Sequence, residues 1–383
     1  MNSRASSILI VSGVAIACAA LLSPIAADAA FPGTNARVVF DSSRSGAVNV
    51  FSVDPNNTSD VRMLTNSSNI DEVAFGSPDG TKIVFRSDRA NPGNGQGNIY
   101  VGSAAANLNQ VTLLPPDGAV AITSGSADDK DPSFIDDNHV VYSHKDVAGN
   151  YQLFTVVVST QVSTLMLAGQ PGCDDSQAVV NPVNISQFAF TRTCVGQAAQ
   201  VFLYDSVQVA SPTNPKNLTA ANVSAYAVTT DAEADWAPDG SRIALTGTGG
   251  PSLFGGFTQL YSIKPDGSDR KPFWPTLVNG TGKNDRFPAY SPDGTKLTFT
   301  RAASATGTDV WTTELASLNT SSIATAPSDI TPARGPDQHP NWLRIDAPPP
   351  SVPEVPFVPA VTLSASLILA GVVLHRQRSL ALR

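Results

Sequence analysis

The sequence predicts an all-β fold, a six-bladed β-propeller of four-stranded antiparallel blades, closed by a C-terminal strand that completes the N-terminal blade. Three observations predict it: a ten-residue pattern recurs about every 50 residues, β-branched and aromatic runs follow each copy, and no helical pattern lies between copies. Tandem units of four short strands are typical of propeller blades.

The repeated pattern begins with an aspartate and ends in a turn. Its three clearest copies, "DRFPAYSPDG", "DAEADWAPDG" and "DEVAFGSPDG", align without gaps, and two degraded copies and a truncated one follow the same order. The six leading residues are Asp71, Asp129, Asp175, Asp231, Asp285 and Asp337.

The Ser-Pro-Asp-Gly turn predicts a tight hairpin between the first and second strands of each blade. Proline presets φ for a type I turn, aspartate accepts local backbone hydrogen bonds, and glycine takes the left-handed conformation. The second strand then follows as a run such as "KIVFRS" or "KLTFTR", and the third as a run such as "NIYVGS" or "QLYSIK".

The two ends of the repeat region complement each other. The run "ARVVFDS", Ala36 to Ser42, reads as a second strand without a preceding turn, while "QHPNWLRI" after Asp337 reads as a first strand without a successor. We expect these two segments to pair in one blade, because closing the ring removes exposed sheet edges. The propeller should span residues 36–345.

The unit resembles the TolB-type, WD40-like propeller repeat. The family pattern D-x-x-P-x-W-S-P-D-G-x-K-I-x-F is seen, with substitutions, in Asp285 to Phe299 and in Asp231 to Leu245. The resemblance covers about residues 36–345, nearly the whole body of the mature chain. It implies a six-bladed TolB-like fold. It does not imply one activity, because related propellers occur in periplasmic TolB, in peptidases and in some polysaccharide lyases.

The N-terminal segment predicts export. Residues 1–29 carry Arg4, then an apolar stretch, then Ala27-Asp28-Ala29, which is typical of a signal peptide cut after Ala29. Lipidation at Cys18 is the alternative, although the residues before it match a lipoprotein cleavage box only loosely.

The C-terminal segment predicts a membrane anchor. Residues 346–354 form a proline-rich spacer, residues 355–374 an uncharged apolar run long enough for a transmembrane helix, and residues 375–383 a basic tail expected in the cytoplasm. The whole resembles the sorting tails of bacterial surface proteins, although Pro353-Glu354-Val355-Pro356 differs by one residue from the usual Pro-Glu-Pro form. A removed lipid-anchor signal is the alternative.

Cysteine and charge content narrow the function further. After removal of the signal peptide, Cys173 and Cys194 remain, and we expect a disulfide between them rather than two free thiols. A net charge of -8 argues against binding nucleic acid. No motif indicates a cofactor or a metal site, the four histidines are expected to be structural or exposed, and we expect a monomer.

The six leading aspartates occupy the same repeat position, where the chain enters the innermost strand, so we expect them to form a ring near one mouth of the central channel. In one interpretation each carboxylate accepts backbone hydrogen bonds and locks the blades together. In the other, part of the ring faces solvent and binds a cation, an amine or a basic peptide.

The sequence therefore favours a non-catalytic cell-envelope protein that binds a protein, peptide or glycan. The contacts would come from the channel mouth or from long loops such as Ser87 to Gly97 and Thr246 to Phe257. The alternative is a lyase or hydrolase acting on polysaccharide with carboxylates at the channel mouth. Such an enzyme should place a His, Tyr or Arg among those carboxylates, for which Arg286 is the candidate.

Overall fold

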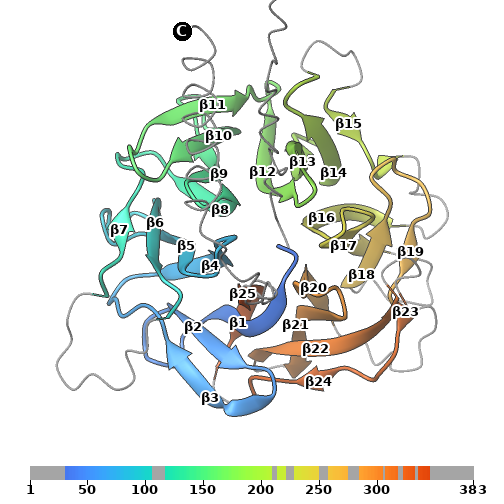
Figure 1. Ribbon diagram of the computed structural model, residues 1–383. Helices are drawn as coiled ribbons and strands as arrows, with labels where there is room; N and C mark the ends of the chain where they lie inside the picture. The colour runs from blue at the N-terminus through green and yellow to red at the C-terminus, as the bar shows by residue number, and fades with distance from the viewer. Residues whose placement is uncertain are drawn as a thin grey trace, which may run out of the picture.

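The computed structural model describes residues 31–105, 117–208, 214–220, 228–249, 258–274, 284–304, 307–317, 322–332 and 335–345. These residues form six antiparallel sheets arranged around a central axis (Figure 1). The expected six-bladed propeller is thus confirmed.

Each blade runs from an innermost to an outermost strand. Blade 1 contains β25 (Asp337–Ile345), β1 (Thr34–Ser42), β2 (Asn49–Asp54) and β3 (Asn57–Met63). Blade 2 contains β4 (Asp71–Gly76), β5 (Lys82–Ser87), β6 (Asn98–Ser103) and β7 (Val120–Ala121). Blade 3 contains β8 (Asp129–Asp136), β9 (His139–Lys145), β10 (Tyr151–Val157) and β11 (Ser163–Leu167).

The second half follows the same order. Blade 4 contains β12 (Cys173–Asn181), β13 (Asn184–Cys194), β14 (Gln200–Asp205) and β15 (Lys216–Asn217). Blade 5 contains β16 (Val228–Trp236), β17 (Ile243–Gly249), β18 (Thr258–Ile263) and β19 (Lys271–Pro272). Blade 6 contains β20 (Asp285–Tyr290), β21 (Lys296–Ser304), β22 (Gly307–Ser317), β23 (Ser322–Ile323) and β24 (Ser328–Asp329).

Blade 6 is the one sheet with five strands, where four were expected. Strand β23 pairs with Leu315 and Ser317 of β22, and β24 pairs with Trp311 and Thr312 of the same strand. The two short strands therefore divide one outer edge between them, and the blade keeps four positions from the axis outward.

The ring closes as the sequence predicts. Strand β25 lies beside β1, although the two stand at opposite ends of the colour scale in Figure 1, and its pairing runs from Ser42 and Asp337 to Thr34 and Ile345. One C-terminal strand thus completes the blade that the N-terminal strands begin.

The repeated turn has the expected geometry. In blade 2, the Ser77 hydroxyl donates to Asp79 at 2.5 Å, the Gly80 amide donates to the Ser77 carbonyl at 2.9 Å, and Gly80 has a φ of +69°. A Cβ on Gly80 would also lie only 2.2 Å from the backbone carbonyl oxygen of Arg344. Glycine is needed there for its backbone conformation and for this close approach.

The core lies between the blades. Tyr290 at the end of β20, for example, packs against Ala237, Ala244 and Phe273 of blade 5. Trp236, Phe134 and Trp342 occupy the same repeat position and are also buried between sheets. In four blades the innermost strand thus contributes one large side chain that fixes its blade to another, whereas blade 2 has Gly76 and blade 4 has Val180 at this position.

A disulfide joins Cys173, the first residue of β12, to Cys194, the last residue of β13. The two residues face each other in the register of blade 4. The bridge therefore fixes the end of the blade at which its ring aspartate lies.

The predicted signal peptide (1–29), spacer (346–354), transmembrane helix (355–374) and basic tail (375–383) lie outside the described residues. Within the described part of the chain, no helix has the length and apolar character to cross a membrane.

Candidate functional site

The six ring aspartates are all buried, and each pairs with a basic side chain. Exposure of these residues ranges from 0% to 6%. The pairs are Asp71 with Arg89, Asp129 with His144, Asp175 with Arg192, Asp231 with Arg270, Asp285 with Arg301 and Asp337 with Arg44. We expected backbone amides as the main partners; the structure shows side chains instead, because a buried carboxylate needs a matching charge.

In blades 3, 4 and 6 the basic residue stands directly opposite its aspartate across the first strand pair. Arg301 donates from Nε and Nη2 to the two oxygens of Asp285 at 2.6 and 2.8 Å. Arg192 holds Asp175 in the same two-bond geometry, which is the strongest form of such a pair.

The other three blades supply the arginine from a different position. In blades 1 and 2 a serine faces the aspartate, and the arginine follows two residues later, as Arg44 and Arg89. In blade 5 the facing residue is Gly247, and Arg270 reaches Asp231 from the position before β19. The basic partner of a ring aspartate therefore comes from one of three positions: directly opposite it, two residues after the opposite residue, or just before the outermost strand.

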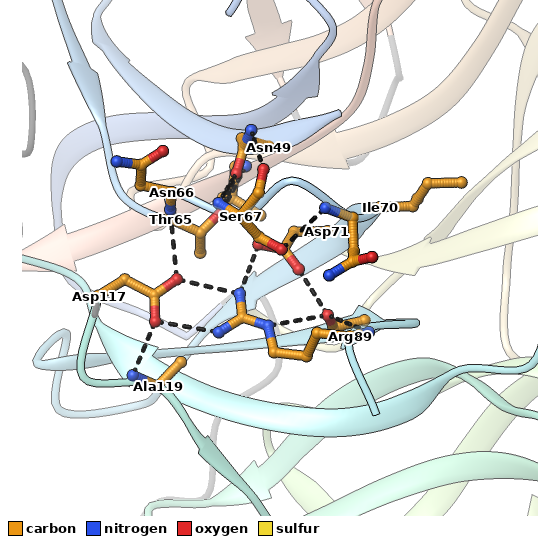
Figure 2. Close-up of polar contacts among 12 residues, drawn as sticks. Asn49, Thr65, Asn66, Ser67, Ile70, Asp71, Arg89, Asp117 and Ala119 are labelled. Atoms are coloured by element: carbon orange, nitrogen blue, oxygen red, sulfur yellow. Dashed lines mark hydrogen bonds and ion pairs between the residues drawn. The ribbon is translucent and has the colours of Figure 1, made fainter. Parts of the chain in front are cut away.

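Figure 2 shows the blade 2 arrangement. Arg89 bridges Asp71, at 2.5 Å, and Asp117, to which it donates two bonds of 3.0 Å. Asp117 also accepts the backbone amides of Asn66 and Ala119. The Asn66 bond connects the end of blade 1 to blade 2, so the network holds neighbouring blades together.

Aromatic rings surround these pairs. The Arg301 guanidinium lies 4.9 Å from the ring centre of Phe299, Arg192 lies 5.1 Å from Phe202, and Arg270 lies 4.4 Å from Tyr261. Burial raises the pKa of the Asp71, Asp129, Asp175 and Asp337 carboxyls despite the opposing basic groups. Burial and pairing together favour a structural role for the ring.

A second ring lies two residues further along each innermost strand. All six of its residues have a left-handed φ between 50° and 57°, and none is glycine: Val73, Asp131, Gln177, Glu233, Phe287 and His339. A β-bulge interrupts the pairing of every innermost strand at this point. Such bulges re-aim side chains, and retained backbone strain is a marker of functional positions.

All six residues of this second ring line one cavity of about 160 Å³ at the channel mouth. Residues that follow them on the innermost strands complete the lining, together with Arg286. None of the six ring aspartates lines the cavity. We refer to this cavity as the mouth pocket.

The opposite end of the channel is filled. Phe31 lines the channel there together with Phe75, Tyr290 and Trp342, and Gly33 donates to the Pro292 carbonyl at 3.1 Å. In Figure 1 this N-terminal end of the blue segment runs into the centre of the ring. Only about 20 Å³ remains in the cavity that Phe31 lines. The mouth pocket is therefore the larger of these two cavities.

Polar side chains of the second ring link neighbouring blades. The Glu233 amide donates to Gln177 Oε1 at 3.2 Å, and the Phe287 amide donates to Glu233 Oε2 at 3.1 Å. The bulge withdraws these amides from the strand ladder, so the previous blade supplies the acceptor.

Two titratable groups of the mouth pocket have shifted pKa values. Burial raises the pKa of Asp235 to about 7, although its Oδ2 accepts the Tyr290 amide at 2.8 Å. Burial lowers the pKa of His339, but the Asp41 carboxylate, which lies 2.6 Å from Nδ1, and the charges of Glu72 and Glu233 together leave that pKa raised. Groups with such shifts in a cavity are candidates for ligand contacts.

No group of three or more metal-ligating side chains with suitable geometry occurs among the described residues. The pocket instead combines apolar side chains such as Val73 and Phe287 with charged ones such as Arg286, Glu233 and Asp131. It can hold a small group that has both apolar and charged parts.

The sequence interpretation missed the second ring. Its residues differ from blade to blade, whereas the aspartates stand out because they repeat. His339, which the sequence predicts to be structural or exposed, lines the pocket and has its Nδ1 2.6 Å from an Asp41 oxygen. The alignment of the repeats gives no signal that singles out this column, because the column one place after each aspartate varies as much in chemistry.

Neither the protein-family models nor the curated proteins compared with this chain give a match. Solved structures do. TolB from Acinetobacter baumannii has a TM-score of 0.59 at 18% identity, covering 82% of this chain and 67% of that one. A protein assigned as TolB from Agrobacterium tumefaciens has a TM-score of 0.51 at 14% identity, covering 82% and 93%.

Hydrazine synthase from Kuenenia stuttgartiensis has a TM-score of 0.55 at 11% identity, and the match covers 82% of this chain but only 47% of that one. At these identities the likeness concerns the fold alone. The chain has a six-bladed β-propeller fold similar to that of the TolB structures, and its own pocket must carry any argument about function.

Proposed function

We propose that this protein is a non-catalytic cell-envelope propeller that binds a protein, peptide or glycan at its mouth pocket, with the surrounding loops adding contacts. One observation carries the proposal: six strained residues of different chemistry line a single cavity, while the repeated aspartates behind them are buried and paired. Residues that are the same in every blade hold the fold, whereas residues that differ from blade to blade can form a surface specific for one ligand.

The size of the mouth pocket supports a small inserted group. Pockets for drug-sized ligands measure roughly 300–1,000 Å³, whereas this one measures about 160 Å³. One side chain or one chain end of a larger partner fits such a space. Loop contacts, for instance from Ser87 to Gly97, would supply the remaining area.

The proposed setting follows from the sequence. Export by the N-terminal segment and anchoring by the apolar residues 355–374 would hold a monomeric propeller on the extracytoplasmic side of the membrane. The partner would then be an envelope or extracellular molecule.

A blocked pocket tests this function. The full-length protein and its Val73→Trp variant are screened against one peptide array and one glycan array, with Val147→Trp as the control because Val147 is fully exposed outside the pocket. We expect ligands that bind the native protein and Val147→Trp but not Val73→Trp. Ligands that all three bind equally would place the binding site elsewhere.

A second candidate is a lyase or hydrolase acting on polysaccharide. His339 and Arg286 line the same pocket as Glu233 and Asp131, which is the arrangement such an enzyme requires. The test is incubation with acidic polysaccharides, measuring new reducing ends and the ultraviolet absorbance of unsaturated products. Turnover that His339→Gln abolishes would support the enzyme over the binding protein.

A further inference from the structure

The ion pair between Arg286 and Glu233 is markedly asymmetric. The Arg286 side chain is 50% exposed, and the Glu233 side chain is 3% exposed. The arginines that pair with the ring aspartates are between 1% and 18% exposed. Arg286 is therefore a cation at the surface of the mouth pocket, whereas those other arginines are parts of the core.

Glu233 has two hydrogen-bond donors besides Arg286, and both bind its Oε2. Its Oε2 accepts the Thr246 hydroxyl at 2.8 Å and the Phe287 amide at 3.1 Å. Arg286 binds the carboxylate from Nε and Nη2, and it is the donor to Oε1. Among the described residues no hydrogen bond engages Arg286 Nη1, so this edge of the guanidinium can meet a ligand carboxylate while the ion pair with Glu233 stays in place.

Phe287 places a second cationic group next to the first. The Arg286 guanidinium lies 4.9 Å from the centre of the Phe287 ring, and the His339 ring lies 4.2 Å from the same centre. His339 uses Nδ1 for Asp41, and a protonated imidazole carries a further N–H at Nε2. Its raised pKa favours that protonated form.

We propose that the mouth pocket binds the free C-terminus of a polypeptide whose last residue is apolar, with the terminal carboxylate held by Arg286. The proposal rests on the binding function proposed above and names its ligand. A planar guanidinium binds a carboxylate through two parallel hydrogen bonds, which makes arginine the suitable residue for this group.

The rest of the lining fits the remainder of such a chain end. Val73, Phe75 and Val179 provide apolar surface for one side chain. Asp131 belongs to blade 3, which stands across the ring from blade 6, where Arg286 lies. A peptide amide can donate to that carboxylate while the terminal carboxylate meets Arg286. A ligand with an internal Asp or Glu side chain would offer a carboxylate to Arg286, but it would have no apolar side chain next to that carboxylate.

Three short peptides test the proposal: Gly-Gly-Leu, its C-terminal amide, and acetyl-Gly-Glu-Gly-amide. Each is titrated into the isotope-labelled full-length protein, and NMR shifts are followed at Arg286 Nε–H and at the amides of the second ring. We expect Gly-Gly-Leu to shift these signals, and the amide and the glutamate peptide to bind at least about tenfold more weakly.

Arg286→Ala should weaken Gly-Gly-Leu binding at least about tenfold, and Arg286→Lys should weaken it less. Arg62→Ala is the matched control, because Arg62 is an exposed ion-paired arginine outside the pocket. Equal binding of acid and amide would overturn carboxylate recognition while leaving the mouth pocket as a binding site. Tighter binding of the glutamate peptide, or no shift with any peptide, would overturn the proposed ligand.

Discussion

Gly247 faces Asp231 across the first strand pair of blade 5, and the guanidinium that neutralises Asp231 occupies the space beside that glycine. A Cβ at position 247 would lie 2.9 Å from Nη2 of Arg270 and 2.7 Å from the Tyr261 ring. The lack of a side chain at Gly247 thus leaves the space in which Arg270, from a distant part of the chain, pairs with Asp231.

We expect Gly247→Ala to displace Arg270 and destabilise the fold by about 2–3 kcal/mol, because Asp231 would lose its buried counter-charge. Urea unfolding measures the change. Gly307→Ala is the control, since a Cβ there meets nothing within 4 Å. An equal effect of both substitutions would argue against the arrangement.

The same substitution in the two rings should have different effects on stability. Asp285→Asn leaves Arg301 buried beside a neutral amide, and we expect a loss of about 3 kcal/mol. Asp131→Asn keeps a residue that tolerates the left-handed backbone at a partly exposed position, so its effect should stay within about 0.5 kcal/mol. Thermal unfolding of both variants compares them, and the reverse order would refute the structural role of the ring.

The raised pKa of Asp235 predicts that the free energy of unfolding depends on pH. Its folded pKa of about 7 lies above the usual value of 3.8, so the folded state holds a proton that the unfolded state releases. The free energy of unfolding should therefore fall as the pH rises from about 4 to about 7.

Asp235→Asn removes this titration and keeps the oxygen that accepts the Tyr290 amide. Asn341, at the same repeat position in blade 1, already accepts the Gly76 amide in this way. From pH 5 to pH 8 the variant should gain roughly 3 kcal/mol relative to the native protein. Urea unfolding at both values measures it, and parallel pH profiles would contradict the shifted carboxyl.

We expect Val73 to contribute to ligand binding while lowering the free energy of unfolding of the protein. A β-branched residue at a φ of 52° is strained. Val73→Asn should therefore raise the free energy of unfolding by about 1 kcal/mol, while removing apolar surface from the mouth pocket. Thermal unfolding together with Gly-Gly-Leu titration measures both effects. A variant that is less stable and binds equally well would contradict this interpretation.

The periodic features of the fold could be predicted from the sequence, because each repeats with its chemistry intact. The Asp-to-turn pattern fixes the first strand and hairpin, and the unmatched segments at Ala36 and Asp337 fix the closure. The division of the outer strand of blade 6 into β23 and β24 could not be predicted, since very short strands carry little pattern.

The candidate site was predictable only in part. Runs such as "FTR" and "YSH" place Arg301 and His144 opposite aspartates, but Arg270 reaches Asp231 from another strand, which no local pattern reveals. The second ring was hidden for a different reason. Its left-handed backbone is imposed by bulges, and residues such as Val73 and Phe287 disfavour that conformation in isolation.

A crystal structure of the protein with a ligand from the array screen would test most directly whether the mouth pocket is the functional site. The second ring predicts ligand atoms in van der Waals contact with Phe287 and Val73, and the six ring aspartates still paired with their basic partners. A ligand bound on the outer strands with the mouth pocket empty, or in direct contact with the ring aspartates, would contradict it.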